Sequence, residues 1–83
     1  MDLADKIKKD ISDNKIMLYM KGTKEMPMCG FSSTVVNILN VHQVEYKATN
    51  VLEDNNIRTE LSKLSNWPTI PQLFCNGELI GGC

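Results

Sequence analysis

The fold of this chain is decided by the stretch Lys21-Gly22-Thr23-Lys24-Glu25-Met26-Pro27-Met28-Cys29-Gly30-Phe31-Ser32. This stretch follows the apolar run Ile16–Met20 and precedes an amphipathic segment, so one cysteine lies immediately before a predicted helix. The first turn of a helix leaves backbone N–H groups unpaired and carries partial positive charge. A thiol at that position ionises more readily, and the thiolate is both a nucleophile and a metal ligand. We therefore expect Cys29 to be the centre of the chemistry of this chain, as a catalytic nucleophile or as a metal ligand.

Apolar residues recur with helical or strand periodicity along the rest of the chain. The spacing of Leu3, Ile7 and Ile11 predicts a first helix. Ile16–Met20 is apolar at every position, as in a strand that is buried on both faces. The patterns that follow predict a helix over 33–40, a strand over 44–49, a helix over 54–64, and a hairpin of strands 72–75 and 78–80 around Asn76-Gly77.

This order of elements predicts a single α/β domain over residues 1–83. Two strands joined through a helix run parallel with a right-handed crossover, and a hairpin adds antiparallel strands. We therefore expect a mixed four-stranded sheet flanked by helices. Gly81-Gly82-Cys83 resembles the beginning of a structural element more than the end of a domain. A sheet of this kind also needs apolar cover on both faces. We expect the chain to be truncated after Cys83, with a C-terminal helix missing.

Composition excludes several classes of function. The 83 residues carry a formal net charge of -1, without the basic patch that binds nucleic acid. The longest apolar run is Ile16–Met20, far short of the roughly 20 residues that span a membrane. Three cysteines without regular spacing argue against a secreted disulfide framework. Since the first residues also lack the features of a targeting segment, we expect a reducing intracellular compartment, either the cytoplasm or the mitochondrial matrix.

Four short blocks together resemble one protein family. They are Lys21-Gly22-Thr23, Cys29-Gly30-Phe31-Ser32, Trp67-Pro68-Thr69-Ile70-Pro71-Gln72 and Gly81-Gly82-Cys83. Each block alone is weakly specific, but all four in this order and spacing resemble a monothiol glutaredoxin of the Cys-Gly-Phe-Ser class over essentially the whole chain. The resemblance implies the thioredoxin fold, which agrees with the predicted order of elements.

The resemblance also implies a binding site for glutathione. Lys21 is expected to contact the Cys29 thiolate and a glutathione carboxylate, although an ordinary solvated lysine explains the residue as well. Thr69, Ile70 and Pro71 resemble the family's cis-proline loop, in which the N–H and C=O of Ile70 pair with the cysteinyl part of glutathione. A rigid turn before a strand would explain the same prolines.

Further positions complete the implied site. Arg58 is expected to meet the glycine carboxylate of glutathione, its alternative being a surface residue of the third helix. Gly82 allows a close approach of the ligand, and the N–H of Cys83 would meet the γ-glutamyl carboxylate. The aspartate that normally follows in the family is missing from this sequence. A zinc site built from the three cysteines and His42 lacks recognisable ligand spacing.

Ser32 occupies the position of the second cysteine of a C-x-x-C motif, so it cannot resolve a mixed disulfide. Two classes of function remain, and the resemblance favours the first. Two chains and two glutathiones would bridge a [2Fe–2S] cluster in a homodimer that delivers clusters to recipient proteins. Alternatively, Cys29 alone would act as a glutathione-dependent thiol–disulfide oxidoreductase that removes glutathione from proteins. A third hypothesis is a pure interaction module that binds a BolA-like partner, and it is compatible with the cluster-delivery hypothesis.

Overall fold

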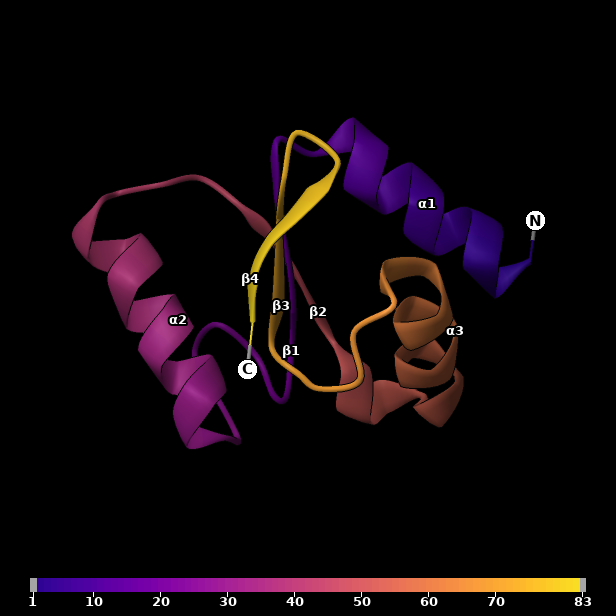
Figure 1. Ribbon diagram of the computed structural model, residues 1–83. Helices are drawn as coiled ribbons and strands as arrows, with labels where there is room; N and C mark the ends of the chain where they lie inside the picture. The colour runs from indigo at the N-terminus through magenta and orange to yellow at the C-terminus, as the bar shows by residue number, and fades with distance from the viewer. Residues whose placement is uncertain (1, 83) are drawn as a thin grey trace.

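The structure, a computed structural model, describes residues 2–82 (Figure 1). The order of its elements is that expected from the sequence, with one additional 3-10 turn. In chain order they are α1 Leu3–Asp13, β1 Ile16–Met20, α2 Gly30–Val41, β2 Lys47–Asn50, the 3-10 turn η1 Val51–Glu53, α3 Asn55–Ser65, β3 Gln72–Cys75 and β4 Glu78–Gly82. The helix expected after Cys83 lies outside the described residues.

The four strands form one mixed sheet in the order β2-β1-β3-β4. β1 pairs in parallel with β2 across the α2 crossover, and it pairs antiparallel with β3. β4 is antiparallel to β3 and completes the hairpin. The expected thioredoxin-type arrangement is therefore confirmed.

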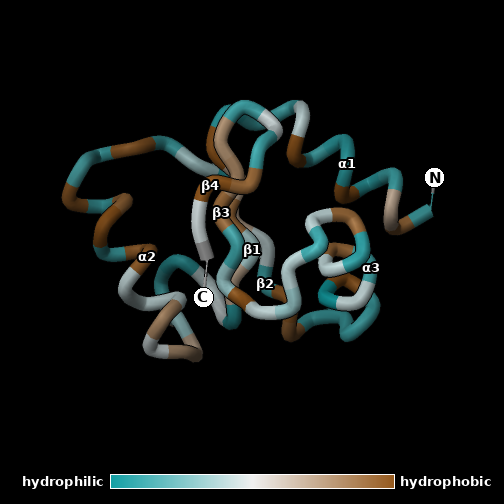
Figure 2. Tube along the Cα trace, in the orientation of Figure 1, coloured by the Kyte–Doolittle hydropathy of each residue, from teal (hydrophilic) through white to brown (hydrophobic). Residues whose placement is uncertain are grey.

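Helices cover both faces of the sheet, and β1 contributes to the core on each side. α1 and α3 cover one face, where Met17 and Tyr19 pack with Phe74. α2 covers the other face, where Leu18 and Met20 pack with Val36 and its neighbours (Figures 1 and 2). Because the side chains of a strand alternate between the two faces, a run that is apolar at every position fills both halves of the core.

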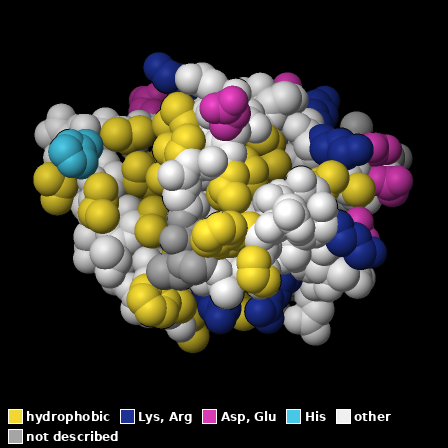
Figure 3. Space-filling model, in the orientation of Figure 1, with side chains coloured by type: hydrophobic (Ala, Val, Ile, Leu, Met, Phe, Trp, Pro, Cys, Tyr) yellow, Lys and Arg dark blue, Asp and Glu magenta, His cyan; other side chains and the backbone are white. Residues whose placement is uncertain are grey.

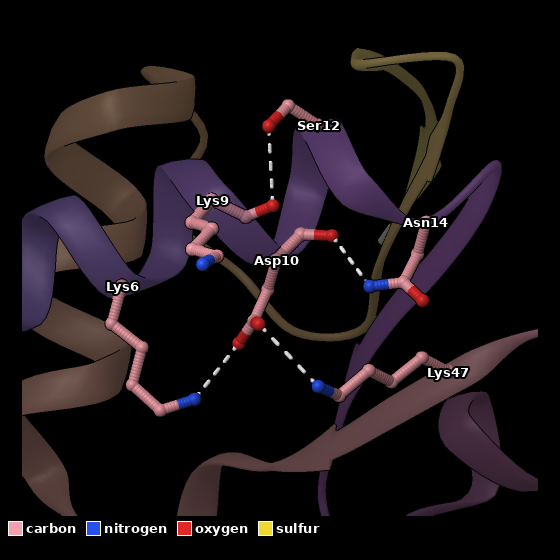
Figure 4. A network of polar contacts seen from close by, with 6 residues as sticks. All are labelled: Lys6, Lys9, Asp10, Ser12, Asn14 and Lys47. Carbon is pink, nitrogen blue, oxygen red and sulfur yellow. Dashed lines mark hydrogen bonds and ion pairs between the residues drawn. The ribbon is translucent and has the colours of Figure 1, made fainter.

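A network of ion pairs connects α1 to the edge strand β2 (Figure 4). The Asp10 carboxylate accepts from Lys6 Nζ at 3.0 Å and from Lys47 Nζ at 3.4 Å. Its backbone carbonyl accepts from Asn14 Nδ2 at 2.8 Å, which closes the end of the helix. Partial burial raises the pKa of Asp10, but the two ammonium groups outweigh burial and hold that pKa below its ordinary value.

Two predicted boundaries were wrong. α2 begins at Gly30 and not at residue 33, because Cys29 already has the extended backbone of an N-cap residue. β2 begins at Lys47 and not at residue 44. In the observed register Met17 faces Lys47, so residues 44 and 45 fall beyond Ile16, the first residue of β1, and have no strand to pair with. Val44 N–H instead donates to Leu39 O at 3.1 Å, at the end of α2.

The loop between β1 and α2 is a hydrogen-bonded turn built on Gly22. Gly22 has a φ of +96°, and a Cβ there would lie 2.4 Å from Met26 O. Its N–H donates to Asn50 Oδ1 at 2.9 Å, and Met28 N–H donates to Lys21 O at 2.8 Å. Only glycine tolerates both this backbone conformation and this close approach.

We predict that Gly22→Ala lowers the free energy of unfolding by about 2–4 kcal/mol, because strain at positive φ adds to a backbone clash. Gly77→Ala is the matched control, since Gly77 also has a positive φ but open space around its Cα. The control should lose only about 1 kcal/mol. Urea unfolding of the three proteins measures both values, and equal losses at the two positions would contradict the close approach.

Candidate functional site

The register of the sheet gathers four loops at one of its ends. Met20 faces Asn50 at the ends of the parallel strands β1 and β2. Gln72, the first residue of β3, lies between Tyr19 of β1 and Gly82 of β4. The loop after β1, the turn after β2, the segment before β3 and the end of β4 therefore meet at the same edge, at the bottom of Figure 1. The beginning of α2 lies there as well.

Cys29 is the candidate reactive group at this edge. It is the N-cap residue of α2, and its sulfur is partly exposed. The sulfur makes no capping hydrogen bond of ordinary geometry, but the backbone N–H groups of Ser32 and Phe31 act on it electrostatically and lower the pKa of the thiol. Limited burial opposes this effect, and the Lys21 ammonium assists it. The lowered pKa of Cys29 agrees in direction with the expected effect of the helix start, and Lys21 makes a smaller contribution than the backbone.

Ser32 has a structural task in addition to its effect on the thiol. Its side chain is completely buried, and its Oγ accepts from the backbone N–H of Lys21 at 3.1 Å. This bond joins the first turn of α2 to the end of β1. Because the Ser32 hydroxyl accepts this bond, it fixes the position of Cys29 relative to Lys21. A serine at this position also provides no second thiol.

The segment before β3 lies at the same end of the sheet. The Ile70-Pro71 peptide bond is cis, as the resemblance implied. Ile70 and Pro71 are buried, whereas Thr69 is exposed. The carbonyl of Thr69 accepts from Gln72 Nε2 at 3.1 Å. The pairing of β3 with β1 begins only at Gln72, so the main chain of Ile70 lies outside that ladder.

Two residues that hold the loops were missed by the sequence reasoning. Asn50 Oδ1 accepts from the N–H groups of Gly22 and Leu52, each at 2.9 Å, and so ties the end of β2 to the loop before Cys29. Gln72 is completely buried, and its amide donates to Trp67 O at 2.9 Å and to Thr69 O. Gln72 belongs to a block that the sequence analysis singled out, but nothing local distinguished its role from that of an ordinary strand residue.

The remaining candidates lie in different places. Arg58 is exposed on α3, and within residues 2–82 it forms no ion pair. Gly82 lies at the site edge opposite Gln72, whereas Cys83 falls outside the described residues. Cys75 lies at the other end of β3, opposite Ile16. His42 is exposed at the end of α2.

Neither a metal cage nor a membrane span is found in the part of the chain that the structure describes. No group of three or more His, Cys, Asp or Glu side chains there is arranged to hold a metal ion. No helix among those residues is long and apolar enough to cross a membrane. Within residues 2–82, the candidate site offers a thiol of lowered pKa at Cys29 and the main chain of Ile70 outside the β1–β3 ladder.

We predict that alkylation of Cys29 by iodoacetamide reaches half of its maximal rate below the ordinary thiol pKa of about 8.5. The folded-state pKa is lowered, so the thiolate fraction at neutral pH exceeds that of an unperturbed thiol. Mass spectrometry of the Cys29 peptide across a pH series gives the midpoint. Lys21→Met should leave it close to that of the unmodified chain, because backbone N–H groups make the larger contribution.

The same titration in concentrated guanidinium chloride is the control, since unfolding removes the helix start and returns the midpoint to its ordinary value. A midpoint that is identical in the folded and unfolded chains would contradict the activation of Cys29.

Comparison with known proteins agrees with this geometry. The glutaredoxin family model matches residues 16–80. The probable monothiol glutaredoxin 2 of Rickettsia typhi is 60% identical over 77 residues, which cover 93% of this chain and 69% of that protein. The solution structure of reduced poplar apo GrxS14 is 44% identical and covers 98% of this chain and 74% of its own, with a TM-score of 0.82.

A buckwheat glutaredoxin–glutathione complex, 21% identical, shares the fold with a TM-score of 0.85 and covers 98% of this chain and 72% of its own. With one cysteine in the Cys29-Gly30-Phe31-Ser32 motif and relatives of this kind, the chain belongs to the glutaredoxin family and, within it, to the monothiol glutaredoxins.

Proposed function

We propose that this chain binds glutathione at the loop edge of the sheet and that two copies hold a [2Fe–2S] cluster for delivery to other proteins. The observation that carries the proposal is a single, partly exposed thiol of lowered pKa with a buried serine in place of its resolving partner. Within residues 2–82, such a site offers one strong ligand and no second cysteine nearby with which Cys29 could form a disulfide.

The main chain of Ile70 and Pro71, just before β3, supports the proposal that glutathione binds here. Pro71 has no N–H, and the β1–β3 ladder begins after it, so the main chain of Ile70 lies beside an incomplete strand edge. An extended tripeptide can pair with such an edge, as peptides do when they add a strand to a sheet. Lys21 and Arg58 would meet the carboxylates of glutathione, and Gly82 would allow the close approach of its backbone. The buckwheat complex has the same fold with glutathione bound.

The ligand count supports a shared cluster. A [2Fe–2S] cluster takes four ligands, and in plant-type and bacterial ferredoxins all of them are thiolates. Cys29 supplies one thiolate, and no other group of metal-binding side chains gathers near it within residues 2–82. A second copy of Cys29 and the thiols of two glutathiones would complete the set. The cluster is then the cargo of the carrier, and its partial exposure at Cys29 lets a recipient protein reach it.

The lowered pKa of Cys29 also favours a second candidate function, glutathione-dependent thiol–disulfide exchange. The Cys29 thiolate would attack the glutathione sulfur of a mixed disulfide, form a Cys29–glutathione disulfide and release the protein thiolate. A second glutathione thiolate would then attack that glutathione sulfur, which gives glutathione disulfide and restores Cys29. Ser32 cannot perform this last step, so the rate depends on how well the second glutathione is held.

Partners and compartment follow from the same proposal. Recipient proteins and a BolA-like partner would bind at the exposed edge around Cys29. A working thiolate and a glutathione supply both require reducing conditions. We therefore place the chain in the cytoplasm or the mitochondrial matrix.

We predict that anaerobic reconstitution with iron, sulfide and glutathione yields a coloured dimer. Size-exclusion chromatography with absorbance at visible wavelengths measures both properties. Cys29→Ser should give a colourless monomer, because the only cysteine that the described residues bring to the site is lost. Cys75→Ser is the matched control and should retain colour and dimer, since Cys75 lies at the far end of β3. Colour that persists in Cys29→Ser would reject the carrier.

We further predict slow turnover of a small glutathionylated disulfide in the presence of glutathione and glutathione reductase. Without a resolving thiol, each cycle waits for a second glutathione. NADPH consumption measures the rate, and Cys29→Ser sets the background. If turnover were as fast as that of a dithiol glutaredoxin measured alongside, thiol–disulfide exchange would replace cluster delivery as the favoured function.

A further inference from the structure

Two methionines in the loop before Cys29 point into solvent. Met26 is 68% exposed and Met28 is 62% exposed, whereas Met17 and Met20 in β1 are 0% exposed. Phe31, on the other side of Cys29, is 60% exposed. Hydrophobic side chains accordingly gather on the surface over the beginning of α2, at the lower left of Figure 3. Single exposed apolar side chains are ordinary, but these three lie within six residues of chain, on either side of one thiol.

The backbone of the loop holds both methionines in place. Thr23 N–H donates to Met26 O at 3.1 Å, and Met26 N–H donates back to Thr23 O at 3.2 Å and to Thr23 Oγ1 at 3.0 Å. Met28 N–H donates to Lys21 O at 2.8 Å. An isolated bridge between Gly22 and Pro27 closes the same turn. These bonds order the backbone of the turn, and both methionine side chains project from it with most of their surface exposed.

We infer that Met26 and Met28 form an oxidation site beside Cys29, at which a hydroperoxide converts the two thioethers to sulfoxides. A sulfur lone pair attacks one oxygen of the hydroperoxide, and the O–O bond breaks. The proton on the attacked oxygen moves to the departing oxygen, which leaves as water when the oxidant is hydrogen peroxide. Each sulfur gains one oxygen and loses two electrons to the peroxide. Susceptibility to this reaction follows the exposure of the sulfur, which separates these two residues from Met17 and Met20.

The modification changes the rim of the reactive thiol. A sulfoxide is polar and accepts hydrogen bonds, so it prefers water where the thioether prefers an apolar neighbour. We call the exposed side chains of Met26, Met28 and Phe31, which precede and follow Cys29 in the chain, its apolar rim, and two of these three become polar on oxidation. This consequence rests on the proposed function: if two chains meet at Cys29, the oxidised rim disfavours their contact and weakens the cluster-bridged dimer.

Peptide mapping of the folded chain after treatment with hydrogen peroxide tests the site itself. Sulfoxide should form at Met26 and Met28 at least roughly tenfold faster than at Met17 and Met20, since only the first pair is exposed. In the chain unfolded by guanidinium chloride, the four rates should converge. Oxidation of Met17 or Met20 as fast as the loop residues in the folded chain would overturn the inference.

A second experiment tests the effect on the rim. The thiols are first capped as methyl disulfides, the chain is treated with peroxide, and dithiothreitol then restores the thiols but not the methionines. After reconstitution with iron, sulfide and glutathione, the oxidised chain should give a smaller fraction of coloured dimer than a capped chain that received no peroxide. The double variant Met26→Leu/Met28→Leu keeps an apolar rim without sulfur, so peroxide should not change its dimer fraction.

The outcomes separate the two proposals. An untreated chain without colour would reject the cluster carrier, yet the peptide map would still report on the oxidation site. An oxidised chain that dimerises as fully as the untreated one would overturn the effect of the rim. A loss of dimer of equal size in the double leucine variant would assign the damage to residues other than these methionines and would overturn it as well.

Discussion

The burial of β1 on both faces, together with its pairing on both edges, is the constraint on which the site depends. Because Met17–Met20 fill two separate halves of the core, a shift by one residue would exchange the contents of both halves. The register is therefore fixed with β2 and with β3 at once. With the register fixed, the ends of β1 and β2 and the start of β3 must coincide. The site is thus a consequence of how the central strand is packed.

The main chain carries out most of the activation of Cys29. N–H groups at the start of a helix are positioned by the helix itself, so their effect on the sulfur needs no flexible side chain. Lys21 adds a smaller contribution from a long, mobile side chain. Ser32 connects the two, since its buried hydroxyl accepts from Lys21 N–H while its own N–H lowers the pKa of the thiol. The monothiol character of the site is accordingly built into the packing of the first turn of α2.

Sequence reasoning succeeded where the signal is local and failed where it depends on a distant partner. Every helix and strand was predicted, because apolar periodicity and the Asn76-Gly77 turn are properties of short segments, and the motif around Cys29 identified the site edge. The start of β2 was misplaced because the alternation at 44–46 is real, but β1 begins at Ile16 and residues 44 and 45 have no strand opposite them. Asn50 acts on Gly22 across 28 positions of sequence, and no pattern within either segment records that bond.

A reactive thiol must be both accessible and held in place, and these requirements conflict in a short loop. An exposed loop lacks the side-chain packing that usually holds a backbone in place. Its conformation must therefore be held by hydrogen bonds within the loop and by hydrogen bonds to neighbouring elements. The Gly22 turn supplies them through Met26, Met28 and Asn50. With the backbone ordered in this way, apolar side chains stay exposed without collapsing onto the core. The apolar rim of Cys29 is therefore available surface, at the point where a tripeptide thiol and a second chain would have to approach.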